Sequence, residues 1–181
     1  MFYYRPTVEH AYMDMIDLGE QVPLGIMREI HRWGAHLMVI TVWLHMFRVF
    51  LTGSYKPPRE FNWAVGVILL TLTLLLSFTG YLLPWDQLAI WAITVGANMG
   101  RASPFLGYEG PGAALMQIGD VKLVHPGADA SFILKAGRFV GEATLLRFYV
   151  LHCIGLPFII MIFMAVHFWR VRKDGGISGP T

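Results

Sequence analysis

The sequence is poor in charged residues and in cysteine. Only 14% of its 181 residues are Asp, Glu, Lys or Arg, and 55% are hydrophobic, whereas a soluble domain has nearer a quarter charged residues. This composition disfavours a soluble globular domain. The single cysteine, Cys153, excludes an internal disulfide and any site built on paired cysteines. No apolar core of signal-peptide length follows Met1, so we expect no cleaved leader.

The apolar residues are concentrated in three runs that are long enough to cross a bilayer, which takes about 20 residues. They cover residues 33–52, 63–84 and 148–169. Aromatic residues at the ends of the runs suit the membrane interface. We therefore predict an all-α integral membrane protein with three transmembrane helices.

The few charges are unevenly placed. Lys56 and Arg59 lie between the first two runs, and Arg170, Arg172 and Lys173 follow the third, whereas the N-terminal segment is acidic. Because positive residues are retained in the cytoplasm, we place the short loop and the tail there and the N-terminus outside.

This orientation predicts the organisation of the chain. An outer-side N-terminal segment (1–28) precedes a transmembrane domain (29–170), whose long loop (85–146) lies outside, and a cytoplasmic tail (171–181) follows. Shorter helices are expected near 7–18, at 86–100 and within the Gly- and Pro-rich stretch 101–142.

Four of the seven histidines form two spaced pairs. His31 and His45 are 14 residues apart at the first run, and His152 and His167 are 15 apart in the third. At 100° per residue, each pair lies roughly on one stripe of its helix, with its members about 21 Å apart along the axis. Each pair therefore places one histidine near each surface of the hydrocarbon core.

Topology predicts which histidines meet. The first and third spans run in the same direction, so His31 should face His152 on the outer side and His45 should face His167 on the inner side. Two imidazoles opposed across a flat macrocycle fill both axial positions of a haem iron, whereas zinc prefers four tetrahedral ligands. Histidines in lipid are costly and usually functional. We therefore predict two bis-histidine haem sites, with interhelical hydrogen bonding as the alternative.

Other residues near these histidines have more than one interpretation. Gly66 and Gly80, again 14 apart, would let a macrocycle approach the second span or would serve ordinary helix packing. Arg28 and Arg48, each three residues from a predicted ligand, would pair with haem propionates or snorkel to the interface. The other histidines are assigned to packing or surface positions: His36, His10 and His125.

Six segments match motifs of a known family: FYYRPTV (2–8), REIHRWGA (28–35), LHMFRVFLTGSYKPPRE (44–60), TGYLLPWDQ (79–87), TLLRFYVLHCIGLP (144–157) and HFWRVRKDGGISGP (167–180). They resemble cytochrome b of the quinol–cytochrome c reductase (bc1/b6f) superfamily, most closely its short b6 type. The resemblance covers most of the chain except about residues 98–140.

The resemblance implies a haem-binding helical bundle with two b-type haems. His31 and His152 would ligate the outer haem, and His45 and His167 the inner one. Gly66 and Gly80 would pack against haem, and Arg28 and Arg48 would lie on the propionate side. The end of the second span and the helix after it match one wall of the quinol-oxidation site, and a basic residue in the tail matches the inner quinone site. The quinone-site candidates are Tyr81, Pro84, Trp91, Ala92 and Arg172.

The implied function is that of a di-haem subunit of a quinol:cytochrome c oxidoreductase, carrying electrons across the membrane between two quinone sites. The sequence lacks the family's Pro-Glu-Trp-Tyr segment, so the subunit should be inactive alone. Expected partners are membrane lipid, a second cytochrome b-type subunit resembling subunit IV, a Rieske iron–sulfur protein and a c-type cytochrome, in a dimeric complex without nucleic acid. A bacterial inner membrane is expected, with a thylakoid-type membrane as the alternative.

Two other functions share some of these features. A di-haem membrane anchor that passes electrons between a dehydrogenase or hydrogenase and quinone would need the same histidines. A haem-free structural or transport subunit would need only the apolar spans.

Two features depart from the b6 pattern. The family has a helix before FYYRP, giving four transmembrane helices in its N-terminal half, and three are seen here. In the b6 type that helix carries a cysteine for an extra covalent haem, for which this sequence supports no prediction. The stretch 101–140 is longer than in the b6 type, and we expect it to dock a soluble partner.

Overall fold

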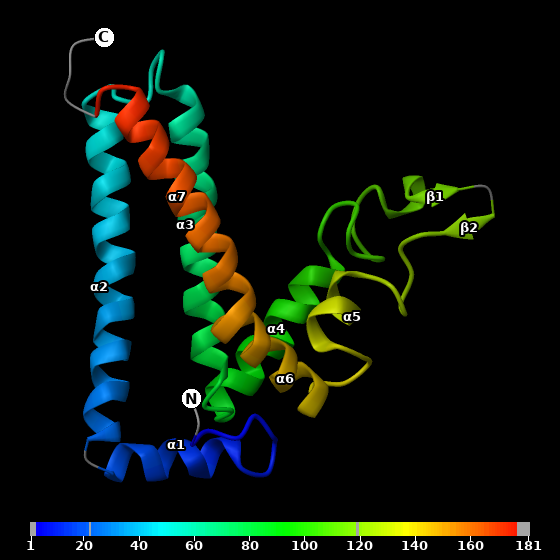
Figure 1. Cartoon of the computed structure of the whole chain (residues 1–181). Coiled ribbons are helices and arrows are strands. Elements are labelled where there is room, and N and C mark those ends of the chain that lie inside the picture. The colour runs from blue at the N-terminus through cyan, green and yellow to red at the C-terminus, as the bar shows by residue number, and fades with distance from the viewer. Residues whose placement is uncertain (1–2, 22, 119, 177–181) are drawn as a thin grey trace. The chain divides into compact units, whose positions relative to one another are not determined.

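The protein is described here by a computed structural model that covers residues 3–21, 23–118 and 120–176, and it is mostly helical (Figure 1). The α-helices are α1 (Ala11–Glu20), α2 (Leu24–Leu51), α3 (Glu60–Leu82), α4 (Gln87–Arg101), α5 (Ala130–Lys135), α6 (Glu142–Val150) and α7 (Leu156–Lys173). A π-helical turn, η2 (Leu151–Gly155), joins α6 to α7.

Three helical stretches are long and apolar enough to cross a membrane: Leu24–Leu51, Glu60–Leu82 and Glu142–Lys173. This confirms the prediction of an all-α fold with three spanning helices. The helix α2 begins at Leu24, nine residues before the predicted apolar span, because its charged first turns remain helical. Arg32 and Glu29 form an i,i+3 ion pair of 2.5 Å there, which is an arrangement that supports a helix.

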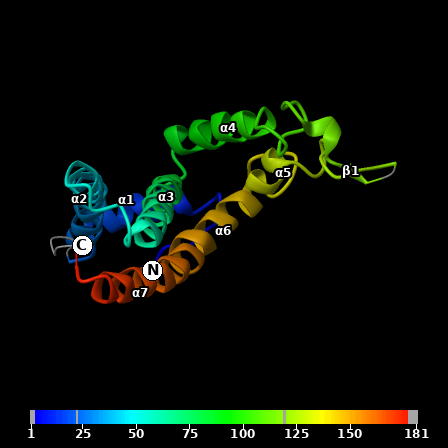
Figure 2. The same ribbon diagram turned by 90° about the horizontal axis from the view of Figure 1, so that it is seen from above.

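The described residues form two compact units. The first contains residues 3–18, 80–118 and 120–150, and the second contains residues 19–21, 23–79 and 151–176. In the second unit, α2, the greater part of α3 and α7 run alongside one another (Figures 1 and 2). This unit contains all four histidines of the two predicted sites.

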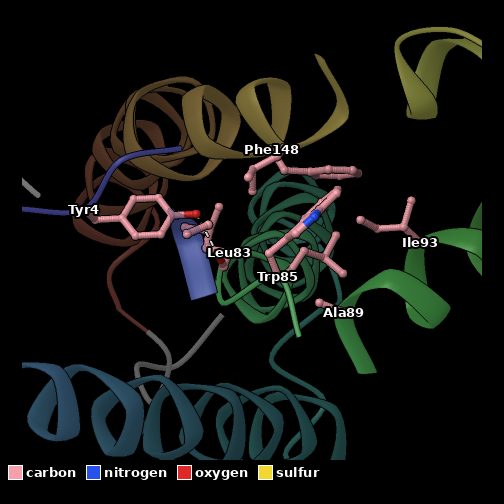
Figure 3. Close-up of a cluster of buried hydrophobic side chains, with 9 residues drawn as sticks. Tyr4, Leu83, Trp85, Ala89, Ile93 and Phe148 are labelled. Carbon is pink, nitrogen blue, oxygen red and sulfur yellow. Dashed lines mark hydrogen bonds between the residues drawn. The ribbon is translucent and has the colours of Figure 1, made fainter. Parts of the chain in front are cut away.

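The first unit has a small apolar core where α3 ends and α4 begins (Figure 3). The hydroxyl of Tyr4 donates a 2.6 Å hydrogen bond to the carbonyl oxygen of Leu83. The ring of Trp85 lies between Phe148 and Ala89 in this view. The helix α4 starts directly afterwards, because the side chain of Asp86 accepts a 2.8 Å hydrogen bond from the amide of Ala89 and so caps its N-terminus.

The stretch that was predicted as loop with one short helix has more structure than expected. It contains α5, as predicted, and also a 3₁₀ turn, η1 (Ala113–Leu115), and a short antiparallel hairpin of β1 (Gln117–Ile118) and β2 (Val121–Lys122). Asp129 caps α5 by accepting a 2.8 Å bond from the amide of Phe132.

Candidate functional site

The first histidine pair joins α2 to η2. The ring centres of His31 and His152 are 6.1 Å apart, and the ring planes are nearly perpendicular at 83°. Nδ1 of His152 lies 3.1 Å from the carbonyl oxygen of Leu76 and 3.2 Å from the hydroxyl of Thr79, both on α3. Three helical segments of the second unit therefore meet at this pair.

The second pair joins α2 to α7. The ring centres of His45 and His167 are 6.4 Å apart, and their planes meet at 82°. Nδ1 of His167 is buried and has no hydrogen-bond partner among the described residues. The structure thus brings together the same two pairs of rings that the topology argument matched. No hydrogen bond joins the two rings of either pair in the described part of the chain.

The π-helical turn explains how the 14-residue spacing in α2 and the 15-residue spacing in the third span can both align two histidines on one face of a helix. In a regular α-helix, residues 14 apart differ by about 40° around the axis, whereas residues 15 apart differ by about 60° in the opposite sense. A π-helical turn takes up one extra residue, and η2 (Leu151–Gly155) contains His152. Without that extra residue, the separation of His152 and His167 corresponds to the 14 residues between His31 and His45.

A pocket of about 440 Å³, including its open mouth, lies beside the second pair. Gly66 is buried in its wall, where a Cβ atom would lie 3.6 Å from Sδ of Met46 and 3.9 Å from Cε1 of His167. A side chain at this position would therefore enter the pocket. The lining residues are His45, Met46, Val49, Ser54, Arg59, Asn62, Trp63, Gly66, His167, Val171, Asp174 and Gly176.

Two charged pocket residues were not identified from the sequence as part of a site. Arg59 is only 7% exposed, although the sequence indicated only its value as a marker of orientation. Asp174 is paired with Arg170 at 3.1 Å, and its side chain is 7% exposed. Both follow the ends of apolar spans, where a basic or acidic residue is common, so no spacing signal distinguished them.

The predicted accessory residues lie in several places. Gly80 is in the last turn of α3, and Arg28 is in the first turns of α2, 3.5 Å from Glu29. Arg48 is exposed in the last turn of α2 and does not line the pocket. The ring of His36 contacts Trp33 of its own helix at 5.8 Å, which is a packing contact.

The quinone-site candidates lie in both units, with four in the first and Arg172 in the second. Tyr81 and Trp91 are exposed, at 53% and 62%. Ala92 packs against the apolar core of the first unit, and Pro84 follows the end of α3. Arg172 is exposed at the end of α7, in the second unit, and is not in the pocket wall.

The geometry of the two pairs suits a group that takes one imidazole on each face. A metal–nitrogen bond of about 2 Å on each side, with roughly 1 Å more from nitrogen to ring centre, separates two opposed rings by about 6 Å. Both measured separations, 6.1 and 6.4 Å, are of this size. Within the described ranges, no set of three or more His, Cys, Asp or Glu side chains is placed to hold a metal ion. Of the 28 residues of α2, only Val49 is buried.

Comparisons with known proteins agree with one another. A family model described as cytochrome b (N-terminal)/b6/petB matches residues 36–181. Cytochrome b6 of Synechococcus elongatus is 42% identical over 180 residues, which are 99% of this chain and 74% of that protein. Cytochrome b6 of Mastigocladus laminosus is also 42% identical, with the same coverage. A solved structure of a hyperthermophilic respiratory Complex III superposes with a TM-score of 0.77 and 30% identity, over 99% of this chain and 43% of that one.

Proposed function

This chain belongs to the cytochrome b N-terminal/b6 family of integral membrane proteins, and we propose that it is the di-haem subunit of a quinol:cytochrome c oxidoreductase. The observation that carries the proposal is the repetition of one arrangement, two opposed and nearly perpendicular imidazoles about 6 Å apart, at two levels of the same helices. The chain would carry electrons across the membrane between two quinone sites.

The four histidines have a single role in this proposal. Haem supplies a one-electron redox centre where it is bound. His31 and His152 hold one such centre near the outer surface, and His45 and His167 hold the other near the cytoplasm. With two histidines as its ligands, such a centre would supply one-electron transfer.

The surrounding residues make room for the macrocycle and neutralise its carboxylates. Gly66 keeps a Cβ atom out of the pocket beside His167, and Gly80 is assigned the corresponding role 14 residues later. Arg28 and Arg48 are assigned to propionates at the two surfaces. The buried Arg59, which lines the pocket of the second pair, is a further cation within this site.

The quinone chemistry is proposed at both ends of the electron path. Quinol would be oxidised on the outer side, against a wall that includes Tyr81, Pro84, Trp91 and Ala92, and would release two protons there. One electron would leave to an iron–sulfur protein and then a c-type cytochrome, and the other would cross the membrane by way of the two groups that the histidine pairs would hold. A quinone near Arg172 accepts electrons on the cytoplasmic side. The same orientation places two segments outside, 1–28 and 85–146, and the tail 171–181 in the cytoplasm.

The complex must supply what this sequence does not contain. The iron–sulfur centre and the second wall of the oxidation site come from partners: a Rieske protein, a c-type cytochrome and a second cytochrome b-type subunit, within a dimeric assembly in membrane lipid. A bacterial inner membrane or a thylakoid-type membrane would suit it.

The test is to purify the complex through a tag on this chain, identify its subunits and measure noncovalent haem b by reduced-minus-oxidised spectra. We expect two haems b per copy of the chain and a Rieske protein among the subunits. A preparation without b-type absorption bands would overturn the proposal. Two haems together with a dehydrogenase or hydrogenase, and no Rieske protein, would show that the chain is a di-haem anchor instead.

A further inference from the structure

The first histidine pair is anchored to α3 by a three-membered hydrogen-bond cluster. Nδ1 of His152 lies 3.1 Å from the carbonyl oxygen of Leu76 and 3.2 Å from Oγ1 of Thr79. The hydroxyl of Thr79 also donates to the Leu76 carbonyl at 3.0 Å. Thr79 is 4% exposed, so water does not compete for these bonds.

This cluster decides where the proton of the His152 ring resides. A carbonyl oxygen can only accept, so a nitrogen 3.1 Å from the Leu76 oxygen must carry a hydrogen. Nδ1 is therefore the protonated nitrogen of the neutral ring, and the lone pair is at Nε2. Since the hydroxyl proton of Thr79 is given to Leu76, the oxygen of Thr79 offers a lone pair to the same Nδ1–H.

The second pair lacks an equivalent anchor. Nδ1 of His167 is buried, and within the described ranges it has no hydrogen-bond partner. The two rings that α7 and η2 contribute are thus held differently, although each faces a histidine of α2 in nearly the same geometry.

We propose that Thr79 is a positioning residue that, together with the Leu76 carbonyl, makes His152 a stronger electron donor and so lowers the reduction potential of the haem it holds. Acceptors at Nδ1–H increase the basicity of a ligating imidazole. A more basic axial ligand stabilises the oxidised iron, which lowers the potential. The inference rests on the proposed function, because it requires His152 to be a haem ligand.

The same helix offers a matched control. Thr73 lies six residues before Thr79 in α3 and is 7% exposed. Among the described residues, its hydroxyl bonds only to the carbonyl of Leu69, at 2.8 Å. Replacing either threonine by valine removes one buried hydroxyl from one helix with little change of shape. Only the change at position 79 removes a contact with a histidine.

The experiment is a potentiometric titration of the b-type absorption bands in membranes that contain the complete complex, with Thr79→Val, Thr79→Ser and Thr73→Val compared with the wild type. We expect Thr79→Val to raise the midpoint potential of the component that His152→Leu removes, and to leave the other component unchanged. Thr79→Ser, which keeps the hydroxyl, should restore the wild-type value, and Thr73→Val should not shift it. Thr79→Ala takes the place of the valine variant if that complex does not assemble.

Three results separate failure of this inference from failure of the proposed function. If two haems b are present and His152→Leu removes one, an unchanged potential in Thr79→Val overturns the role of Thr79 alone. An equal shift in Thr73→Val would show a general effect of helix packing and would overturn it as well. If His152→Leu removes no haem, the proposed ligand set itself is wrong.

Discussion

The guanidinium group of Arg5 bonds to both carboxylate oxygens of Asp14, at 2.6 and 3.1 Å. The backbone amide of Arg5 also donates to this carboxylate at 2.7 Å. The side chain of Asp14 is 1% exposed, so water has little access to this carboxylate. These bonds fix the first turns of α1 to the segment that precedes it, outside the spanning helices.

This ion pair predicts a pH dependence of the N-terminal segment. The hydrogen bond from Arg5 holds the pKa of Asp14 below its ordinary value of 3.8, against the opposing effect of burial. A lowered pKa stabilises the folded segment above the ordinary value, and this contribution is lost as the pH falls through the pKa of the folded state. Hydrogen exchange of residues 3–20, corrected for intrinsic rates, should be constant near neutral pH and should accelerate several-fold below about pH 4.

The control for this effect is a charge change elsewhere on the same helix. Asp14→Asn should accelerate exchange already at neutral pH and remove most of the acid dependence, whereas Glu20→Gln, at an exposed position, should change neither. Equal acid dependence in Asp14→Asn and the wild type would contradict the assignment to this carboxylate.

The pairing of the histidines predicts which substitutions remove the same haem. His45→Leu and His167→Leu should each remove the haem near the cytoplasm, and His31→Leu and His152→Leu should each remove the other haem. The reason is that the ring centres of each pair are only 6.1 or 6.4 Å apart. Haem content and redox difference spectra of the complex provide the measurement. His36→Leu, whose ring contacts only Trp33 among the ring pairs of the described residues, should keep both. Loss of one shared component in His45→Leu and His152→Leu would show that the pairing is wrong.

The position of Gly66 in the pocket wall predicts that larger side chains there will reduce haem binding at the second histidine pair progressively. Gly66→Ala places a Cβ atom 3.6 Å from Met46 Sδ and should lower occupancy of the second site slightly, whereas Gly66→Leu should abolish it. Gly34→Ala is a matched control, because a Cβ at that helical glycine meets nothing within 4 Å. The haem content of the purified complex distinguishes these cases. Full occupancy in Gly66→Leu would place the macrocycle elsewhere.

The charge distribution predicts the orientation of the chain. In a Cys153→Ala background, which has no other cysteine, we would introduce Lys56→Cys or Leu115→Cys, both at exposed positions. A membrane-impermeant thiol reagent added to intact cells should label the cysteine at position 115 and not the one at position 56. The opposite labelling pattern would invert the topology and exchange the outer and inner histidine pairs.

The proposed division of the quinol-oxidation site between subunits predicts that this chain is inactive alone. The isolated subunit should show b-type spectra but no electron transfer from a reduced quinol to an oxidised c-type cytochrome. Activity should return when the Rieske protein and the second cytochrome b-type subunit are present. Inhibitor-sensitive turnover by the isolated chain would rule out the divided complex.

The sequence predicted the spans and the histidine pairs because both depend on helical periodicity and length. Those rules hold over long apolar helices, where each turn repeats the last. These rules could not identify Arg59 and Asp174, which line the pocket from beyond the ends of the spans. At those positions, the path of the backbone determines what a side chain contacts. The alternation expected of a strand cannot be recognised in β1 and β2, which have two residues each.

The π-helical turn and the contacts of His152 could not be predicted from the sequence either. The 15-residue spacing was visible in the sequence, but it did not reveal that η2 absorbs the extra residue. The bonds of His152 with Leu76 and Thr79 connect positions 76 and 73 residues apart, and no local pattern encodes such a contact.

The hydrogen bond from Tyr4 to Leu83 has a consequence for the biogenesis of the protein. Pro84 follows Leu83 and has no amide hydrogen, and the carbonyls at the end of a helix lack partners within it. Tyr4 supplies a partner from 79 residues earlier in the chain. Because Leu83 is synthesised long after Tyr4, the N-terminal segment must wait, undocked, until the second span has emerged on the same side of the membrane. The segment around Tyr4 thus reaches its final position only after a segment that is synthesised later.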